Sequence, residues 1–285
     1  MNYQHAFHAG NFADVHKHAV LARIVDYLRG KPAPFRVIDS HAGAGRYDLS
    51  GPQAARSGEW QRGIKLLVEA NRDAKLDAKV TALLAPYLEC VAACNAGAGL
   101  RYYPGSPLIV QKLLRRSDRL IACEAEPRAA AALKSVMGRD RRVKMLAIDG
   151  WMAINAGVPP KERRGLVLID PPYEERNEFQ RLSDGLAEAH AKWSTGIYLV
   201  WYPIKDRIEP DALAKRLRGH AIQKMLRCEI TLGVPRADEG LIGSGLIAVN
   251  PPYTLAEELA VLQPSLARVF SPEAHHRLDW LARER

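Results

Sequence analysis

The chain has 285 residues, 47% of them hydrophobic, which is enough for one large α/β domain or one domain with an insertion. A formal net charge of +9 suggests a polyanionic partner, and no apolar run approaches the roughly 20 residues needed to span a bilayer. The four cysteines show no Cys-x-x-Cys spacing and the first residues do not resemble a signal peptide, so a cytoplasmic protein with reduced thiols is expected.

The N-terminal segment predicts a long helix, which we expect to pack across the mouth of a sheet. Apolar residues recur at helical spacing from Phe12 to Leu28, and Asn11 can cap the start of this helix. His16 and His18 are two residues apart, and that spacing points them to different sides of a helix. The spacing argues against a metal site, and no metal is expected.

The first predicted strand, residues 35–39, leads directly into the loop His41-Ala42-Gly43-Ala44-Gly45. Glycines after a strand let the backbone approach a ligand closely, so Gly43 is a candidate for cofactor binding. The full Gly-x-Gly-x-x-Gly fingerprint is absent, which argues mildly against NAD. The short pattern still fits a dinucleotide, S-adenosylmethionine or a simple tight turn.

Residues 50–100 are predicted to form a helical insertion in a main domain that comprises residues 1–49 and 101–285. Gly and Pro flank the segment, and its apolar residues recur at helical spacing. It carries basic residues, among them Arg62 and Lys65. These charges form either a solvated helical face or a surface that contacts RNA, and both interpretations stay open.

Acidic residues follow two further predicted strands. The strand at residues 120–124 ends in Glu124, where a ribose diol would be held. The strand at residues 143–148 is followed by Asp149 and Gly150, and an acid there could accept a hydrogen bond from an adenine amine. A single acid in this position is more often an exposed residue with no ligand. Acids at the ends of successive strands, however, favour a ligand site.

The strongest motif is Asp170-Pro171-Pro172-Tyr173, which follows the apolar run at residues 166–169. The run predicts a buried parallel strand, and the two prolines prevent a helix from starting directly after it. The Asp170 carboxylate and the Pro171 carbonyl can accept hydrogen bonds from an exocyclic amine, and Tyr173 can stack on a base. The motif is typical of amino-methyltransferases, although a solvated turn with a core-capping aromatic is the alternative.

The C-terminal half predicts a helix at residues 186–193, a strand at 196–201 that ends in Trp201-Tyr202-Pro203, and a pair of strands at 225–232 and 244–249. The last predicted strand ends in Asn250-Pro251-Pro252-Tyr253, a motif of methyltransferases that act on glutamine or adenine. Asp170 is favoured over Asn250, because its strand is expected beside the first strand at the switch point of the sheet.

Taken together, five segments resemble the RlmJ family, adenine-N6 methyltransferases of 23S ribosomal RNA. The segments are residues 7–11, 39–45, 101–107, 170–173 and 201–203, and the resemblance extends over almost the whole chain. It implies an α/β fold: a Rossmann-like class I S-adenosylmethionine-dependent methyltransferase sheet with helices on both faces and a small helical insertion. S-adenosylmethionine would be the methyl donor and 23S ribosomal RNA the partner of an expected monomer.

The resemblance also assigns roles to single residues. Asp170 would lie at the target amine with Pro171 and Tyr173, and Tyr3 would contact RNA together with Tyr173. The implied cofactor contacts besides Gly43 are Lys17, His18, His41, Ser106, Glu124, Asp149, Gly150 and Asp170.

Three alternatives stay open at this point. A DNA adenine-N6 methyltransferase would share the chemistry and nearly the same site. A glutamine methyltransferase would use Asn250. A non-catalytic RNA-binding protein could retain the same fold, but the intact set of acids and glycines argues against it.

Overall fold

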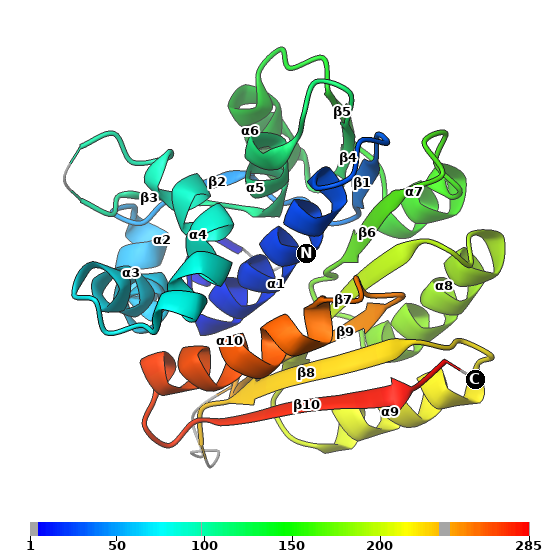
Figure 1. The fold of residues 1–285 in the computed structure, drawn as a ribbon. Coiled ribbons are helices and arrows are strands. Elements are labelled where there is room, and N and C mark those ends of the chain that lie inside the picture. The colour runs from blue at the N-terminus through cyan, green and yellow to red at the C-terminus, as the bar shows by residue number, and fades with distance from the viewer. Residues whose placement is uncertain (1–4, 98, 234–239, 285) are drawn as a thin grey trace.

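The computed structural model describes residues 5–97, 99–233 and 240–284, which form a layered α/β fold around one large mixed sheet (Figure 1). Helices cover both faces of the sheet, so the predicted Rossmann-like architecture is confirmed. Across the sheet, the eight strands are β10 (His275–Ala282), β8 (Met225–Thr231), β9 (Gly243–Val249), β7 (Ile197–Ile204), β6 (Gly165–Ile169), β1 (Arg36–Asp39), β4 (Arg119–Cys123) and β5 (Val143–Leu146).

Five neighbouring strands, from β7 to β5, run parallel, and their carboxyl ends meet at one edge of the sheet. The apolar run before Asp170 forms β6, and all five of its residues are buried. Because β6 pairs with β1, the strand before Asp170 lies beside the first strand, as predicted. The strand-end acids therefore gather at a single edge.

The other half of the sheet is antiparallel. β9 pairs with β7 and with β8, which confirms the predicted pair of strands in this region. The strand before Asn250 is not the last one, however, because β10 adds to the edge beyond β8. β10 was missed because only one of its eight residues is fully buried, so it lacks the apolar alternation of a typical strand.

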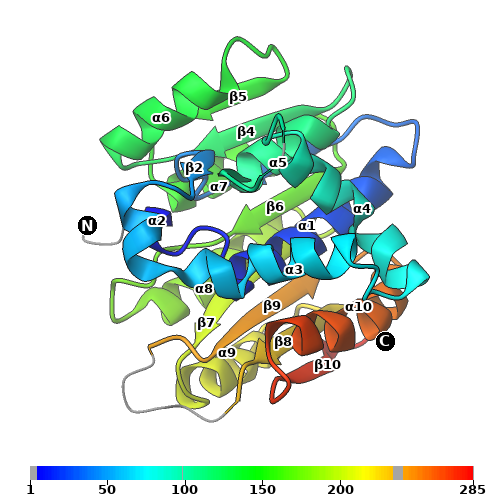
Figure 2. The same ribbon diagram turned by 90° about the vertical axis from the view of Figure 1, so that its left-hand side faces the viewer.

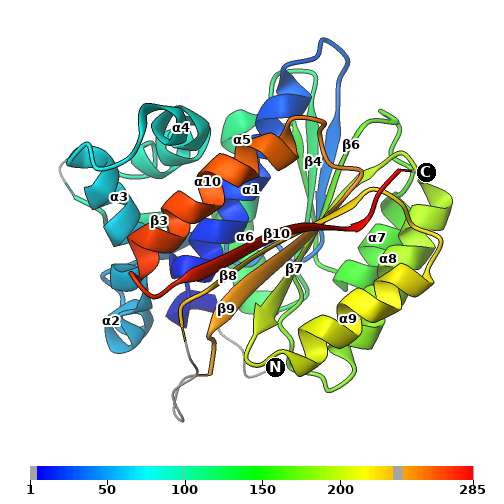
Figure 3. The same cartoon turned by 60° about the horizontal axis from the view of Figure 1, so that its bottom comes forward.

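Two layers of helices bury the two faces of the sheet (Figure 3). The side chains of successive strand residues alternate between these layers, with Val37 and Leu168 on one side and Ile38 and Ile169 on the other. One layer holds α1 (Phe12–Arg29), α5 (Ser106–Leu113), α6 (Pro127–Met137) and α10 (Leu255–Phe270). The other holds α7 (Gly150–Gly157), α8 (Glu178–Lys192) and α9 (Ile208–Gly219).

Helix α1 matches its prediction closely, and the Asn11 side chain accepts a hydrogen bond from the Asp14 amide as an N-cap. Other boundaries differ. The helix expected at residues 186–193 is the end of the longer α8. A short strand, β3 (Tyr102–Pro104), pairs with β2 (Arg46–Asp48) outside the large sheet. Trp201, Tyr202 and Pro203 lie inside β7 rather than after it.

The predicted insertion is helical and lies between β2 and β3 (Figure 1). Its elements are α2 (Pro52–Ser57), the 3-10 helix η2 (Glu59–Arg62), α3 (Ile64–Arg72) and α4 (Ala78–Ala92). Leu67, Leu84 and Tyr87 belong to the same buried cluster as α1, so this segment shares the core of the main domain. Its treatment as a separate subdomain stays a prediction. None of the helices in the described ranges combines the length and apolar character that a bilayer crossing requires.

Candidate active site

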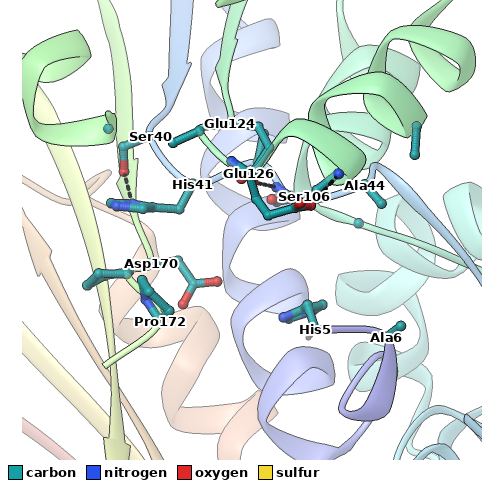
Figure 4. Close-up of a pocket in the computed structure, with 18 of the residues that line it drawn as sticks. His5, Ala6, Ser40, His41, Ala44, Ser106, Glu124, Glu126, Asp170 and Pro172 are labelled. Carbon is teal, nitrogen blue, oxygen red and sulfur yellow. Dashed lines mark hydrogen bonds between the residues drawn. The ribbon is translucent and has the colours of Figure 1, made fainter. Parts of the chain in front are cut away.

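A cavity of about 1080 Å³ opens at the carboxyl edge of the parallel strands (Figure 4). It is lined by residues that follow four different strands, as expected for a ligand site of an α/β sheet. Helix α1 packs on one face of the sheet rather than across its mouth as predicted, and its first turns contribute Lys17 and His18 to the lining. The lining includes all nine predicted cofactor residues: Lys17, His18, His41, Gly43, Ser106, Glu124, Asp149, Gly150 and Asp170.

Two glycines shape the floor of this cavity, because neither could carry a side chain there. Gly43 has a positive φ of 61°, and a Cβ atom on it would lie 2.3 Å from the Tyr47 hydroxyl. A Cβ atom on Gly150 would lie 2.2 Å from the Ser40 carbonyl oxygen. The backbone thus forms part of the wall, which a bound molecule could approach closely.

The Glu124 carboxylate is fixed in place just after β4. The Gly43 amide donates to one of its oxygens at 2.8 Å, and the Glu126 amide donates to the other at 2.8 Å. Each oxygen retains acceptor capacity toward the cavity. A preorganised carboxylate of this kind suits a vicinal diol.

Asp149 already has local partners. Its carboxylate caps α7 by accepting from the Trp151 and Met152 amides, and Arg181 forms an ion pair with it at 3.1 Å. The prediction that Asp149 accepts from an adenine amine therefore stays untested. Beside it, His41 forms a 2.8 Å hydrogen bond with the Ser40 hydroxyl, and burial lowers the pKa of His41 to about 4, so its ring is neutral at pH 7.

Two residues that line this cavity carry a buried polar atom without a hydrogen-bond partner among the described residues: His18 through Nε2 and Glu178 through Oε1. The other ring nitrogen of His18 lies 2.7 Å from the Tyr103 hydroxyl. Asp39 lies just behind the lining: its Oδ1 is also without a partner, and its Oδ2 accepts a 2.7 Å hydrogen bond from Ser106, which lines the cavity. Such orphaned atoms, together with the glycine floor, fit a site that receives a polar ligand.

Asp170 stands at the end of β6 and forms an ion pair with Lys17, with 2.5 Å between Oδ2 and Nζ. Lys17 also contacts Asp14 at 2.9 Å, and its side chain is only 4% exposed. Burial alone would lower the pKa of Lys17, yet the charges of Asp14 and Asp170 raise it above its ordinary value. Burial likewise opposes the ionisation of Asp14, but Lys17 holds the pKa of Asp14 well below its usual range. Lys17 and Asp14 are therefore both charged.

A second cavity, of about 810 Å³, lies beside the first. Lys17, Asp170, Pro171 and Pro172 line both cavities, so the Asp-Pro-Pro turn forms the wall between them. Tyr173 lines only the second cavity, which brings it together with the other residues predicted to be catalytic.

An aromatic pair borders the second cavity. Tyr173 has a positive φ of 53°, and its hydroxyl donates a 2.6 Å hydrogen bond to the Trp201 carbonyl. The two ring centroids are 5.7 Å apart, and the Trp201 indole nitrogen donates to the Ser244 hydroxyl. These hydrogen bonds fix the Tyr173 and Trp201 rings, which form an aromatic wall close to Asp170.

The Asn250 motif lies elsewhere. β9 runs antiparallel to β7, and Val249 pairs with Tyr198 near the start of β7, so Asn250 is at the edge of the sheet opposite Asp170. Its side-chain amide donates to the carbonyls of Ser194 and Gly196, both at 2.8 Å. Asn250 therefore ties two loops together, and strand direction adds a second reason to prefer Asp170 to its place beside the first strand.

Sequence reasoning missed several residues at the two cavities. Asp14 was passed over although its spacing of three from Lys17 is that of a helical ion pair. His5 lines both cavities, and its ring nitrogen lies 3.1 Å from the Asp14 carboxylate. Nothing in the sequence showed that Trp201 faces a cavity. Tyr3, predicted to contact RNA, lies outside the described residues, and no metal-binding cluster occurs in the part of the chain that the structure describes.

Comparison with known proteins gives a consistent result. The family model described as Ribosomal RNA large subunit methyltransferase D, RlmJ, matches residues 32–282. Two proteins named Ribosomal RNA large subunit methyltransferase J, from Escherichia coli and Haemophilus influenzae, are 38% and 36% identical to the chain, with all of both sequences covered in each case. The crystal structure of a protein from Legionella pneumophila is similar, with a TM-score of 0.87 and 34% identity over 96% of this chain and 98% of that one.

Proposed function

The chain belongs to the RlmJ family of ribosomal RNA large subunit methyltransferases, and on that premise we propose that it methylates the N6 atom of an adenine in 23S ribosomal RNA. The observation that carries the proposal is Asp170, held by Lys17 on the wall between two cavities. One cavity would hold the methyl donor and the other the base. A monomer that acts in the cytoplasm stays part of the proposal.

The first cavity suits S-adenosylmethionine, which when bound supplies a methyl group on a sulfonium centre. Glu124 would accept hydrogen bonds from its ribose hydroxyls, because the carboxylate is already fixed by two amides. His18 and Ser106 offer polar atoms on the α1 side, and Gly43 and Gly150 let the backbone come close. These contacts orient the donor and limit its freedom before transfer.

The second cavity would receive the adenine. Trp201 and Tyr173 provide a rigid aromatic wall for a base that is unpaired or flipped out of its helix. Tyr3 is proposed as a further RNA contact. The exocyclic amine would then meet the Asp170 carboxylate and the Pro171 carbonyl at the dividing wall.

Asp170 has two tasks in this proposal. The lone pair of N6 is delocalised into the ring, and hydrogen bonds from the amine to Asp170 and Pro171 favour a more tetrahedral, nucleophilic nitrogen. As N6 gains positive charge, the carboxylate stabilises that charge and takes the proton. Lys17 keeps one carboxylate oxygen occupied, so the other is directed to the amine.

The test is to map N6-methyladenosine by mass spectrometry in 23S ribosomal RNA from cells with and without the gene. One adenine should lose its methyl group without the gene and regain it with purified protein and S-adenosylmethionine. A hairpin that contains this adenine and the matching DNA hairpin should then be compared as acceptors. Transfer to the DNA alone, or to neither, would contradict the proposal.

A further inference from the structure

The positive charge of the chain is concentrated on the face opposite the active site. Four connections precede the parallel strands β1, β4, β5 and β6, and they comprise residues 29–36, 115–119, 139–144 and 161–164. Together they contain thirteen Lys and Arg residues and three acids, a formal charge of +10, while the whole chain carries +9. We call these four segments the rear basic face.

The order and direction of the parallel strands explain why the rear basic face is separate from the active site. The four strands are neighbours in the order β6-β1-β4-β5, so the segments before them lie side by side across about 15 Å of sheet edge. Parallel strands begin at one edge and end at the other, and Asp170 and Glu124 are at the far ends of β6 and β4. Figure 2 shows the α1–β1, α5–β4 and α6–β5 connections on the side of the sheet away from the N-terminal segment.

The acids of the rear basic face are already neutralised within it. Asp118 pairs with Arg115 at 2.8 Å, Asp140 pairs with Arg142 at 2.7 Å, and Glu162 pairs with Arg36 at 2.8 Å. Six exposed cations outside the strands make no ion pair with any described residue and are free for an external anion: Lys31, Arg116, Arg139, Arg141, Lys161 and Arg163.

Hydrogen bonds from three arginine side chains connect the segments of this face to one another. Arg115 donates to the carbonyls of Arg29, Lys31 and Ala33, which links the α5–β4 connection to the α1–β1 connection. Arg142 donates to the Leu114 carbonyl, and Arg164 donates to the Ala33 carbonyl. These hydrogen bonds hold in place the backbone that carries the free cations, which lowers the conformational entropy lost when the face binds a polyanion.

We propose that the rear basic face is a second RNA-binding surface, which holds the phosphates of a segment of the substrate RNA distant from the target adenine. This inference rests on the proposed function for the identity of the RNA. Ten of the thirteen cations are arginines, whose planar guanidinium groups suit phosphate recognition. No exposed large hydrophobic residue of the described ranges falls in the four segments, so the face lacks the apolar anchor of a membrane-binding surface.

The test compares two RNAs: the short hairpin that carries the target adenine and the complete 23S ribosomal RNA. The rear variant combines Arg116→Gln, Arg139→Gln, Arg141→Gln and Arg163→Gln, which removes four exposed charges and no ion pair of the described residues. The matched control removes four exposed cations that lie outside the four segments: Lys215→Gln, Arg218→Gln, Arg268→Gln and Arg283→Gln.

The rear variant should bind the complete RNA at least about tenfold more weakly than the control variant, and the slope of log affinity against log salt should fall by about 3. Methyl transfer to the short hairpin should stay within about twofold of the parent, because we expect that RNA to contact the active-site cavities and not the rear basic face. Equal effects of the rear and control variants would mean that only net charge matters and would overturn the proposal. So would unchanged binding of the complete RNA.

Two further outcomes distinguish RNA binding from membrane binding, and the further inference from the proposed function. If the rear substitutions abolish binding to phosphatidylglycerol vesicles and leave RNA affinity intact, the partner is a membrane surface and the RNA proposal is wrong. If the parent methylates neither RNA, the proposed function fails. The binding titrations still decide whether the rear basic face holds RNA, since they do not depend on transfer.

Discussion

Replacing Lys17 by Met tests the arrangement at the dividing wall. The side chain of Lys17 is almost fully buried between Asp14 and Asp170, so the substitution leaves Asp14, itself 3% exposed, without its main counter-charge. Removing one partner of a buried ion pair typically costs about 3–5 kcal/mol of stability. A protein of ordinary stability, about 5–15 kcal/mol, can tolerate this loss and remain folded at 25 °C.

The pH dependence of stability should also change sign. In the parent, the pKa of Asp14 is depressed, so its contribution is present above its unfolded pKa of about 4 and is lost as the pH falls further. Without Lys17, burial acts unopposed by that charge and raises the pKa of Asp14. Relative to the parent, Lys17→Met should therefore lose more free energy of unfolding at pH 8 than at pH 5, as measured by urea unfolding.

A second substitution separates folding from catalysis. Adding Asp14→Asn to Lys17→Met removes the stranded charge and should recover most of the lost free energy of unfolding. Methyl transfer should stay at least about 100-fold below the parent in both variants, because the Asp170 carboxylate still lacks the cation that orients it. If single-turnover transfer recovers along with stability, or if Lys17→Met alone transfers within about threefold of the parent, Lys17 is only structural and the reasoning fails.

Four other expectations follow from the same geometry. Asp170→Asn should slow single-turnover transfer about 10²–10⁴-fold with little effect on cofactor affinity, while Asn250→Ala should leave transfer nearly unchanged; the reverse order would move the site to β9. Glu124→Ala should weaken S-adenosylmethionine binding roughly ten- to a hundredfold by calorimetry, since hydrogen bonds to a charged acceptor contribute about 1.5–3 kcal/mol, and an unchanged dissociation constant would remove Glu124 from the site. Burial raises the pKa of Asp39 to about 7, so the stability from its protonated form is complete below its unfolded pKa and is lost as the pH rises through 7. Asp39→Asn should flatten that part of the stability curve in urea titrations, and an unchanged curve would show that Asp39 ionises normally. Arg62→Glu with Lys65→Glu should lower hairpin affinity in fluorescence anisotropy if the insertion contacts RNA, and superimposable salt titrations would show that it does not.

Much of the fold was predictable, because buried parallel strands have a strong local signature. The run before Asp170 is apolar at every position and is buried at every position. The exposed edge strand β10 has no such signature, since pairing with β8 rather than burial defines it. Strand direction was equally hidden, and it is the antiparallel course of β9 that places Asn250 away from the site.

The candidate site was predictable only in part. The acids and glycines at predicted strand ends identified residues of the first cavity, because the carboxyl ends of parallel strands lie at the same edge of a sheet. The second cavity depends on contacts between residues far apart in the chain. Trp201 becomes its wall through a hydrogen bond to Ser244 and through the Tyr173 hydroxyl bound to its carbonyl. No local pattern encodes such contacts.

The distribution of charge over the surface could not be predicted from the sequence either. It separates the binding of a cationic cofactor from the binding of an anionic RNA. Eight acidic and four basic residues line the first cavity, while the rear basic face alone holds the net positive charge of the chain. An acidic cavity suits S-adenosylmethionine, whose sulfonium and ammonium groups outweigh its carboxylate. The same acids repel phosphates and would weaken RNA binding at the mouth. In the proposed reaction, cations at the opposite edge of the sheet attract the RNA without opposing the entry of a cationic donor into the acidic cavity.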